Sequence, residues 1–498
     1  MASQQHKART LSTAPKHTLE DKVSRITKPD AIRRAFSEFL RVPTLIIVAF
    51  FLLAIGAYIL DRGVSTDIAW LEQLRQIIST YLFNSAQTAS SLLSMIAGSI
   101  ITVTSITFSL LLIAVQQASS TLTFQVIDQF LRRKMNQVYV GFFIGLGIYS
   151  LVILALISPP FIPLFGAALA VPLAIAALYI LVVLIYNTMD QMRPTKIIGA
   201  IHDYTIKARE HQRPLLHQTR QTARYAGASS VLLKATERGY VTEIKLDKLE
   251  RAVQQTQGEV EIVLCVSIGS YVAFGDVLAE IKAQTIEEAA AVGQAMQGAV
   301  QLERVRDQQQ DAAYGISQIT TIAWTSVSTS KQNPAPGVQA AHALRDLLAR
   351  WSIAEVEERS TDTPLPVVYH DNVLDQLMDA FEALVVVASE SMQYQVFAQV
   401  MQAFAIMFDR VPQHMQDRME AVIRRSLSAL GDHVLTTELD AALSAVSQTL
   451  CTAGRSETAD AVQSAHEQMA STVGKLNARS TRAQSAKQSA KQSPQQSE

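Results

Sequence analysis

Residues 90–117 read SSLLSMIAGSIITVTSITFSLLLIAVQQ, and this uncharged stretch decides the fold. It lies inside an uncharged run from Ser85 to Ile127, whose most apolar part falls between Leu92 and Val115. Because a helix rises about 1.5 Å per residue, about 20 apolar residues suffice to cross the hydrocarbon core of a bilayer. Apolar residues continue at helical spacing as far as Leu131, which predicts that the helix extends beyond the membrane surface.

Small and polar side chains recur along this predicted helix. Their steps of 3, 4, 4, 3, 4 and 7 residues keep all of them on one helix face. Hydroxyl groups in hydrocarbon usually face protein or water, so we expect lipid on the opposite face. Two interpretations remain open: close helix packing, or the lining of a water-filled path by this span from several subunits. The seven residues are Ser91, Ser94, Gly98, Thr102, Ser105, Ser109 and Gln116.

Three further apolar runs predict spans at about 43–60, 138–158 and 162–189. The Ser158-Pro159-Pro160 phrase predicts a tight reversal between the last two spans, because proline disfavours helix. The third span contains Gly141 and Gly145, a GxxxG pair typical of helix packing. None of the four predicted spans contains Asp, Glu, Lys, Arg or His, which argues against a proton relay or an ion-coupled carrier.

Basic residues in the loops predict the orientation. Nine Lys or Arg precede Pro43, and Arg132-Arg133-Lys134 follow the second span. The two opposite loops contain only Arg62 and Arg75. By the positive-inside rule, both termini are expected in the cytoplasm and the protein in the inner (plasma) membrane. The basic residues after the fourth span are Arg193, Lys196, Lys207, Arg209 and Arg213.

The loop between the first two spans carries apolar residues at helical spacing from Ile68 to Leu82. This pattern fits an amphipathic helix at the outer interface, and equally a packed extracytoplasmic loop.

The chain after the membrane changes its pattern several times. Short β-branched runs separated by glycines predict a small β module at 230–283. Its phrase from Val266 to Leu278 resembles half of a biotinyl or lipoyl barrel-sandwich hybrid, but Lys248 lies in a helical stretch and not at a hairpin tip, so carrier function does not follow.

The predicted fold class is therefore a membrane α-helical protein with a cytosolic α+β region. The full division is a basic cytosolic segment at 1–42, a transmembrane domain at 43–192, a membrane-proximal helix at 193–229, the β module, a helical region at 284–475 and a disordered tail at 476–498.

Composition and motifs limit the function classes. Charged residues make up 17% of the chain and the net charge is -1, so electrostatics implies no nucleic-acid partner. Cys265 and Cys451 have no metal-binding or redox spacing and are interpreted as small buried apolar residues. Phosphate-binding loops, HExxH, GxSxG and dinucleotide fingerprints do not occur in the sequence. We therefore expect no enzyme activity, no cofactor and no metal site.

Several segments resemble a bacterial family of predicted membrane proteins of unknown function. The likeness lies in the phrase from Ser94 to Ser120, in Gly239-Tyr240-Val241, and in the stretch from Gly269 to Leu278. It spans about residues 35–430 and implies the four-span architecture, with no activity attached. In that family the helix with Tyr-Gly is usually followed by Arg-Ala-Leu-Ser-Pro and then Asn-Asp-Pro, whereas residues 325–329 read TSVST and 332–334 read QNP. The cytosolic motif candidates are Arg306, Gln310, Asp311, Gly315 and Asn333.

Two functions from different classes follow. The first is an oligomeric pore or channel-like protein with the second span lining the path, whose partners are the lipid bilayer and further copies of the chain. The second is a membrane-anchored scaffold or sensor whose cytosolic region binds a protein or metabolite, with the polar face serving only helix packing. An unknown ion or protein partner is compatible with either.

Overall fold

The structure is a computed structural model of the 498-residue chain. It describes residues 40–63, 73, 76–80, 83, 85–121, 134–158, 161–191, 193–225, 229–256, 258–307, 309–328, 332–357, 364–430 and 434–472. The described residues form two compact units that divide between Arg193 and Pro194. The disordered tail predicted at 476–498, the predicted helical continuation at 122–131 and most of the predicted interfacial helix at 68–82 lie outside the described residues.

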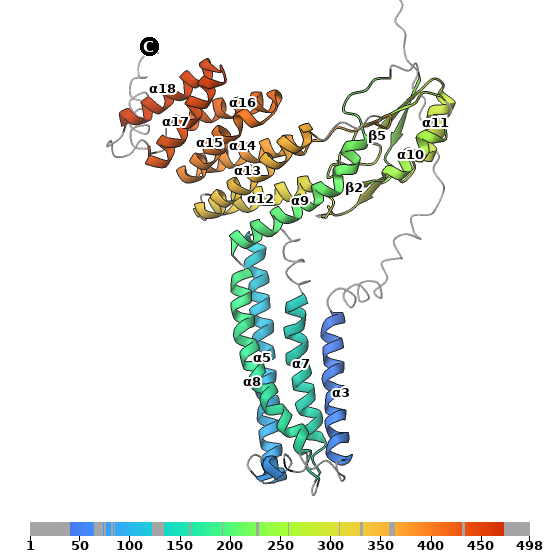
Figure 1. The fold of residues 1–498 in the computed structure, drawn as a ribbon, viewed down its shortest axis with the longest axis vertical. Helices are drawn as coiled ribbons and strands as arrows, with labels where there is room; N and C mark the ends of the chain where they lie inside the picture. Colours follow the sequence, from blue (N-terminus) through green and yellow to red (C-terminus); the bar gives the residue numbers. More distant parts are fainter. Residues whose placement is uncertain are drawn as a thin grey trace, which may run out of the picture. The chain divides into compact units, whose positions relative to one another are not determined.

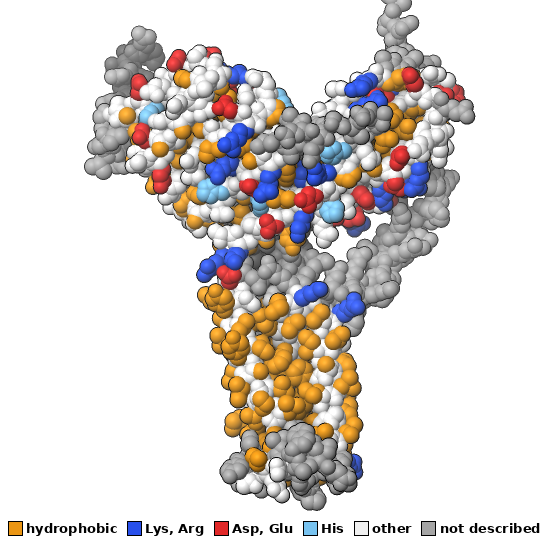
Figure 2. Space-filling view, viewed as in Figure 1, with side chains coloured by type: hydrophobic (Ala, Val, Ile, Leu, Met, Phe, Trp, Pro, Cys, Tyr) orange, Lys and Arg blue, Asp and Glu red, His pale blue; other side chains and the backbone are white. Residues whose placement is uncertain are grey.

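The first unit contains four long apolar helices: α3 (Arg41–Gly63), α5 (Ala86–Thr121), α7 (Lys134–Ala155) and α8 (Leu164–Gln191). Each is long and apolar enough to cross a membrane, in agreement with the four predicted spans. Helices α7 and α8 each pack against the other three helices of this unit (Figure 1). Figure 2 shows that apolar side chains cover the visible face of these helices, as a lipid-facing surface requires.

The reversal predicted after the third span is present. Helix α7 ends at Ala155, and Ser158 and Phe161 exchange two backbone hydrogen bonds of 3.2 and 2.7 Å across the turn. The helix therefore stops three residues before the predicted end at 158, because the chain is already turning.

Close packing in this unit uses glycines. Gly141 and Gly145 of α7 face α3, where an added Cβ would lie 2.8 Å from the Pro43 Cα and 2.6 Å from the Phe50 ring respectively. A side chain at Gly141 would require a shift of the α3 backbone, and one at Gly145 would require the Phe50 ring to move. The GxxxG pair therefore packs against the first span of the same chain.

One carboxylate lies inside the unit, beyond the last residue of the predicted first span. Helix α3 extends to Gly63, and its Asp61 is buried with 7% exposure. The Asp61 carboxylate accepts hydrogen bonds of 3.0 and 3.1 Å from the Phe165 and Gly166 amides at the start of α8. The first turn of a helix has amides without intrahelical acceptors, so this carboxylate caps α8.

The second unit begins with α9 (Pro194–Gln218) and continues into two small sheets. The strands are β1 (Ser229–Lys234), β2 (Gly239–Ile244), β3 (Glu261–Leu264), β4 (Tyr271–Val272), β5 (Val277–Ala283), β6 (Val300–Glu303) and β7 (Val367–Val368), with helices α10 (Leu246–Gln254) and α11 (Ile286–Ala295) between them. One sheet has the order β1-β5-β3-β7 and the other β4-β2-β6. All pairs are antiparallel except β3 with β7.

The β module draws on more of the chain than residues 230–283. The strands β6 and β7 come from sequence that was assigned to the helical region, and β7 pairs with β3 about 100 residues earlier in the chain. Turn glycines appear where the sequence requires them: Gly269 and Gly275 have φ of +88° and +87°. Lys248 lies in α10, as predicted.

Helices form the rest of the second unit: α12 (Ala312–Val327), α13 (Pro334–Glu357), α14 (Val373–Glu390), α15 (Tyr394–Met407), α16 (Gln413–Leu430), α17 (Thr437–Thr452) and α18 (Ser456–Thr472), with a short 3-10 turn η2 (Phe408–Arg410). They stack in two layers (Figure 1). One layer contains the contacts α12 with α14, α14 with α16 and α16 with α18, and the other α13 with α15 and α15 with α17. The architecture is thus the expected one, four apolar helices followed by a mostly helical region with small sheets.

The interpretation of both cysteines as buried is wrong. Cys265 and Cys451 are exposed free thiols. Cys265 follows the last residue of β3, where the sheet has ended, and Cys451 lies beside the buried Leu450 but on the outer side of α17.

Candidate functional site

The small and polar residues of α5 face outward in the single chain. All seven, from Ser91 to Gln116, are exposed. The buried face of the same helix consists of Leu93, Ala97, Ile100, Val103, Thr107 and Leu111, and it packs against α7 and α8. At about 100° per residue, this buried face lies opposite the polar one.

The expectation of lipid on the face opposite the hydroxyls is therefore wrong. The physical reason is that the larger apolar side chains gain more from burial against α7 and α8, while the hydroxyls need no neighbour. Thr102, Ser105 and Ser109 donate to the carbonyls of Gly98, Ile101 and Ser105, at 3.1, 3.1 and 3.0 Å. Donation to the carbonyl four residues earlier satisfies a helical hydroxyl within its own helix.

The outward face is narrow and open. An added Cβ at Gly98 would meet no atom within 4 Å. Bulky apolar side chains border the face on both sides, and they are Met95, Ile101, Ile106, Phe108, Leu112 and Ile113, each at least 44% exposed. We call the seven residues the α5 stripe. It is a polar strip between two apolar borders, and it is exposed among the described residues of the chain.

Most of the cytosolic motif candidates lie together in a buried polar cluster. Asp311 is 1% exposed and accepts two hydrogen bonds from Arg306, of 2.6 and 3.0 Å. Asp311 also caps α12 by accepting from the Tyr314 amide, and the Arg306 guanidinium lies 4.8 Å from the Tyr314 ring. An added Cβ at Gly269 would lie 2.5 Å from an Arg306 nitrogen, so the glycine turn closes directly over this ion pair.

A second ion pair of the same kind was not predicted. Arg209 of α9 donates to both carboxylate oxygens of Asp371, at 2.9 and 2.6 Å, and their side chains are 4% and 7% exposed. Gln212 of α9 donates to the Gln310 carbonyl at 2.7 Å, which joins α9 to the start of α12. We call Arg209, Gln212, Arg306, Asp311 and Asp371 the polar junction. It connects α9, the β module and α12 within the second unit.

Tyr369 closes the junction on the side of the β module. Its hydroxyl accepts a hydrogen bond of 3.3 Å from the Ile268 amide. Burial, and then the neighbouring Asp371 carboxylate, raise the pKa of Tyr369 above its usual value, so the hydroxyl stays neutral.

The two remaining motif candidates have structural positions. Gly315 lies where α12 approaches α9 most closely, and any Cβ there would collide with Thr205 of α9. Asn333 lies apart from the junction: its side chain accepts a hydrogen bond of 3.3 Å from the Ala335 amide at the start of α13. No group of three or more His, Cys, Asp or Glu in the described part of the chain has the geometry to hold a metal ion.

The sequence contained signals for half of this cluster. Arg306 and Asp311 are close in the chain and were identified through the family resemblance. Arg209 and Asp371 are 162 residues apart, and no local sequence pattern predicts their contact. Arg209 was counted as a cation in the loop after the fourth span, but its charge is neutralised in this buried pair.

Comparison with known proteins gives one match. Neither the curated proteins nor the solved structures yield a significant match to the chain. A family model described as "Predicted membrane protein (DUF2254)" matches residues 37–405, which include the four apolar helices, the α5 stripe, the polar junction and the chain as far as α15. The chain is therefore a membrane protein, and it belongs to the DUF2254 family of predicted membrane proteins.

Proposed function

We propose that the protein is a homo-oligomer in the membrane, in which the α5 stripes of several copies face a shared water-filled path. The observation that supports this most directly is the exposure of the stripe on the side of α5 opposite its packed face. A polar strip that is exposed among the described helices can pack against another copy of the chain or face water.

The length and chemistry of the stripe favour a path. From Ser91 to Gln116 it extends over about 37 Å at 1.5 Å per residue, which exceeds the roughly 30 Å of hydrocarbon. Because the hydroxyl protons of Thr102, Ser105 and Ser109 are used by the helix backbone, their oxygens present lone pairs outward. The stripe contains no full charge, so we expect weak selection between ions.

Conductance in planar bilayers tests this proposal. The purified protein should conduct, and Thr102→Leu and Ser105→Leu should each reduce the unitary current, because a bulky apolar group would narrow and dry the path. Ser99→Leu is the matched control: it is an exposed serine on the same helix, about a quarter turn from the stripe, and should leave the current unchanged. A bilayer that stays silent at all voltages and ionic conditions tried would refute the path.

We also propose the inner membrane as the location, with both termini in the cytoplasm. Nine Lys or Arg before Pro43 and the Arg132-Arg133-Lys134 phrase support this orientation. Reporter fusions that are active only in the cytoplasm should give a signal at both ends of the chain. A periplasmic signal at either end would contradict the orientation.

The second candidate is a membrane-anchored scaffold or sensor. The two-layer stack from α12 to α18 favours it, because stacked helices build extended surfaces that bind partners. In that case Thr102→Leu and Ser105→Leu would weaken assembly in detergent, measured by size-exclusion chromatography with light scattering, and no flux would be seen in any variant.

A further inference from the structure

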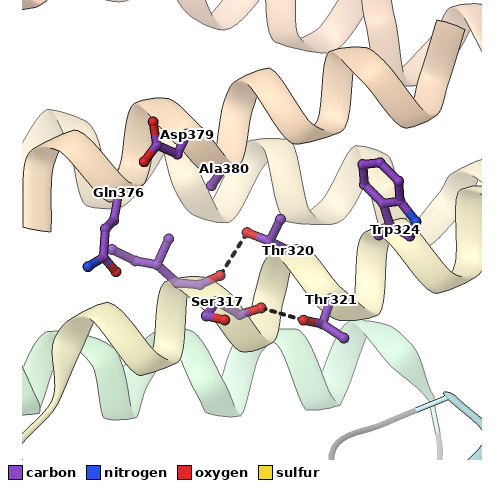
Figure 3. A pocket seen from close by; sticks show the side chains of 8 residues that line it. Ser317, Thr320, Thr321, Trp324, Gln376, Asp379 and Ala380 are labelled. Atoms are coloured by element: carbon purple, nitrogen blue, oxygen red, sulfur yellow. Dashed lines mark hydrogen bonds between the residues drawn. The ribbon is translucent and has the colours of Figure 1, made fainter. Parts of the chain in front are cut away.

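A pocket of about 400 Å³ lies between α12 and α14, and none of the polar junction residues lines it. Its wall on α12 contains Ser317, Thr320, Thr321 and Trp324, and its floor contains Ile316 and Ala380. Figure 3 shows Gln376 and Asp379 of α14 at one end and Trp324 of α12 at the other, with the hydroxyl side chains between them. A cavity of this size accommodates a small organic molecule.

Three polar groups of the pocket are hydrogen-bond acceptors only. The Thr320 and Thr321 hydroxyls donate to the carbonyls of Ile316 and Ser317, both at 2.8 Å, so their oxygens offer only lone pairs to a ligand (Figure 3). The Asp379 carboxylate is likewise an acceptor only. Lone pairs on these oxygens favour positive charge in the pocket over negative charge.

The Asp379 end of the pocket carries a net negative charge. Arg418 of α16 donates to Asp379 at 2.7 Å and also to Asp375, so one guanidinium serves two carboxylates. No Lys, Arg or His is among the residues that line the pocket in the described structure. Arg418, Asp375 and Asp379 together therefore carry a net charge of -1.

The opposite end offers an aromatic face. Trp324 is 39% exposed, an unusual exposure for a large aromatic residue on a packed helix. The face of an indole ring attracts cations more strongly than the rings of Tyr or Phe.

We propose that the pocket between α12 and α14 binds a small organic cation, with an ammonium group between the Trp324 ring and the Asp379 carboxylate. The indole ring, the acceptor-only threonines and the carboxylates at the Asp379 end all favour positive charge, and they disfavour anions. This proposal does not rest on a path through the membrane, since both walls belong to the second unit.

Choline is a suitable probe, and 3,3-dimethylbutan-1-ol is its uncharged counterpart of the same shape. Saturation-transfer NMR on the full-length protein, held in a sugar-headed detergent, measures binding of both. Choline should bind saturably with a dissociation constant of about 1–10 mM, a reasonable strength for so small a ligand. The alcohol should bind at least about tenfold more weakly, because it lacks the charge that both ends of the pocket attract.

Four variants locate the site. Trp324→Leu keeps an apolar side chain and removes the ring, so choline binding should weaken about three- to thirtyfold. Asp379→Asn should weaken it about threefold or more, and Arg418→Gln should strengthen it about threefold, because each shifts the rim charge by one unit near the ligand. Glu382→Gln is the control on the same helix: Glu382 pairs with Arg425 outside the pocket, and binding should be unchanged.

Three results would overturn the proposal. Absence of saturable choline binding up to about 50 mM, in both the unmodified protein and Arg418→Gln, would exclude a cation site of useful strength. Equal binding of the alcohol would exclude recognition of charge. Unchanged binding in Trp324→Leu would place the ligand elsewhere. Melting curves of each variant show whether the fold is kept.

Discussion

Replacement of Asp371 by asparagine should strongly destabilise the second unit. The substitution keeps the shape of the side chain but removes the Asp371 charge from the buried Arg209 guanidinium. Two hydrogen bonds of 2.9 and 2.6 Å lose their ionic character, and neither side chain can reach water, since they are 4% and 7% exposed. Breaking one partner of a buried ion pair typically costs about 3–5 kcal/mol, so we expect at least about 3 kcal/mol.

The reporter for this experiment lies beside the pair. The Trp351 ring is 5.6 Å from the Arg209 guanidinium and is 5% exposed, so its fluorescence should report loss of this packing. Replacement of Trp70 and Trp324 by phenylalanine leaves Trp351 as the only tryptophan. Urea titration of the full-length protein in detergent should then show the midpoint lowered by about 1 M or more, at about 3 kcal/mol per M.

An exposed ion pair next to Trp351 supplies the matched control. Arg350 of α13 donates to Asp346 at 2.6 Å, but the two side chains are 55% and 43% exposed. Because water and salt screen such a pair, Arg350→Gln should cost about 0–0.5 kcal/mol. If Asp371→Asn shifted the midpoint no more than Arg350→Gln does, burial of the junction would not be the source of its stability, and the reasoning would fail.

Three further predictions concern single residues. Asp61→Ala should lower the melting temperature in nanodiscs, because two amides at the start of α8 lose their acceptor at a cost of about 1–3 kcal/mol, and an unchanged melt would contradict the cap. Gly145→Ala should destabilise the monomer by about 1–3 kcal/mol through its contact with α3, whereas Gly98→Ala, with open space around it, should alter only assembly between copies; equal melting shifts would refute the distinction. Burial, and then a neighbouring glutamate, raise the pKa of Cys265 above its usual value. In a Cys451→Ser background its alkylation rate should therefore rise with a midpoint above about pH 8.5, and a midpoint below that value would contradict the shift.

Features carried by long, regular patterns could be predicted from the sequence. The four apolar helices follow from runs that match the thickness of a bilayer, and the strands from β1 to β5 follow from β-branched runs between glycines. Gly269 and Gly275 fall within the phrase that resembles half of a barrel-sandwich hybrid, and both have the positive φ that glycine adopts readily in a tight turn.

Features that depend on contacts between distant parts of the chain could not be predicted from the sequence. The strand β7 has only two residues, Val367 and Val368, and it forms a strand because it pairs with β3 at the edge of the sheet. The Arg209 pair with Asp371 depends on the same kind of long-range approach. The expectation of lipid on the face of α5 opposite the stripe was wrong because the periodicity of one helix gives its faces but not which face its neighbours cover.

The contact between Gly315 and Thr205 has a mechanical consequence. At this point α9 and α12 approach so closely that no methyl group fits between them. The polar junction joins them again where Gln212, seven residues after Thr205, donates to the Gln310 carbonyl just before α12. Two helices joined at two points cannot slide past each other, so they behave as a single stiff rod. A ligand that moves α12 would therefore move α9 with it, within the second unit.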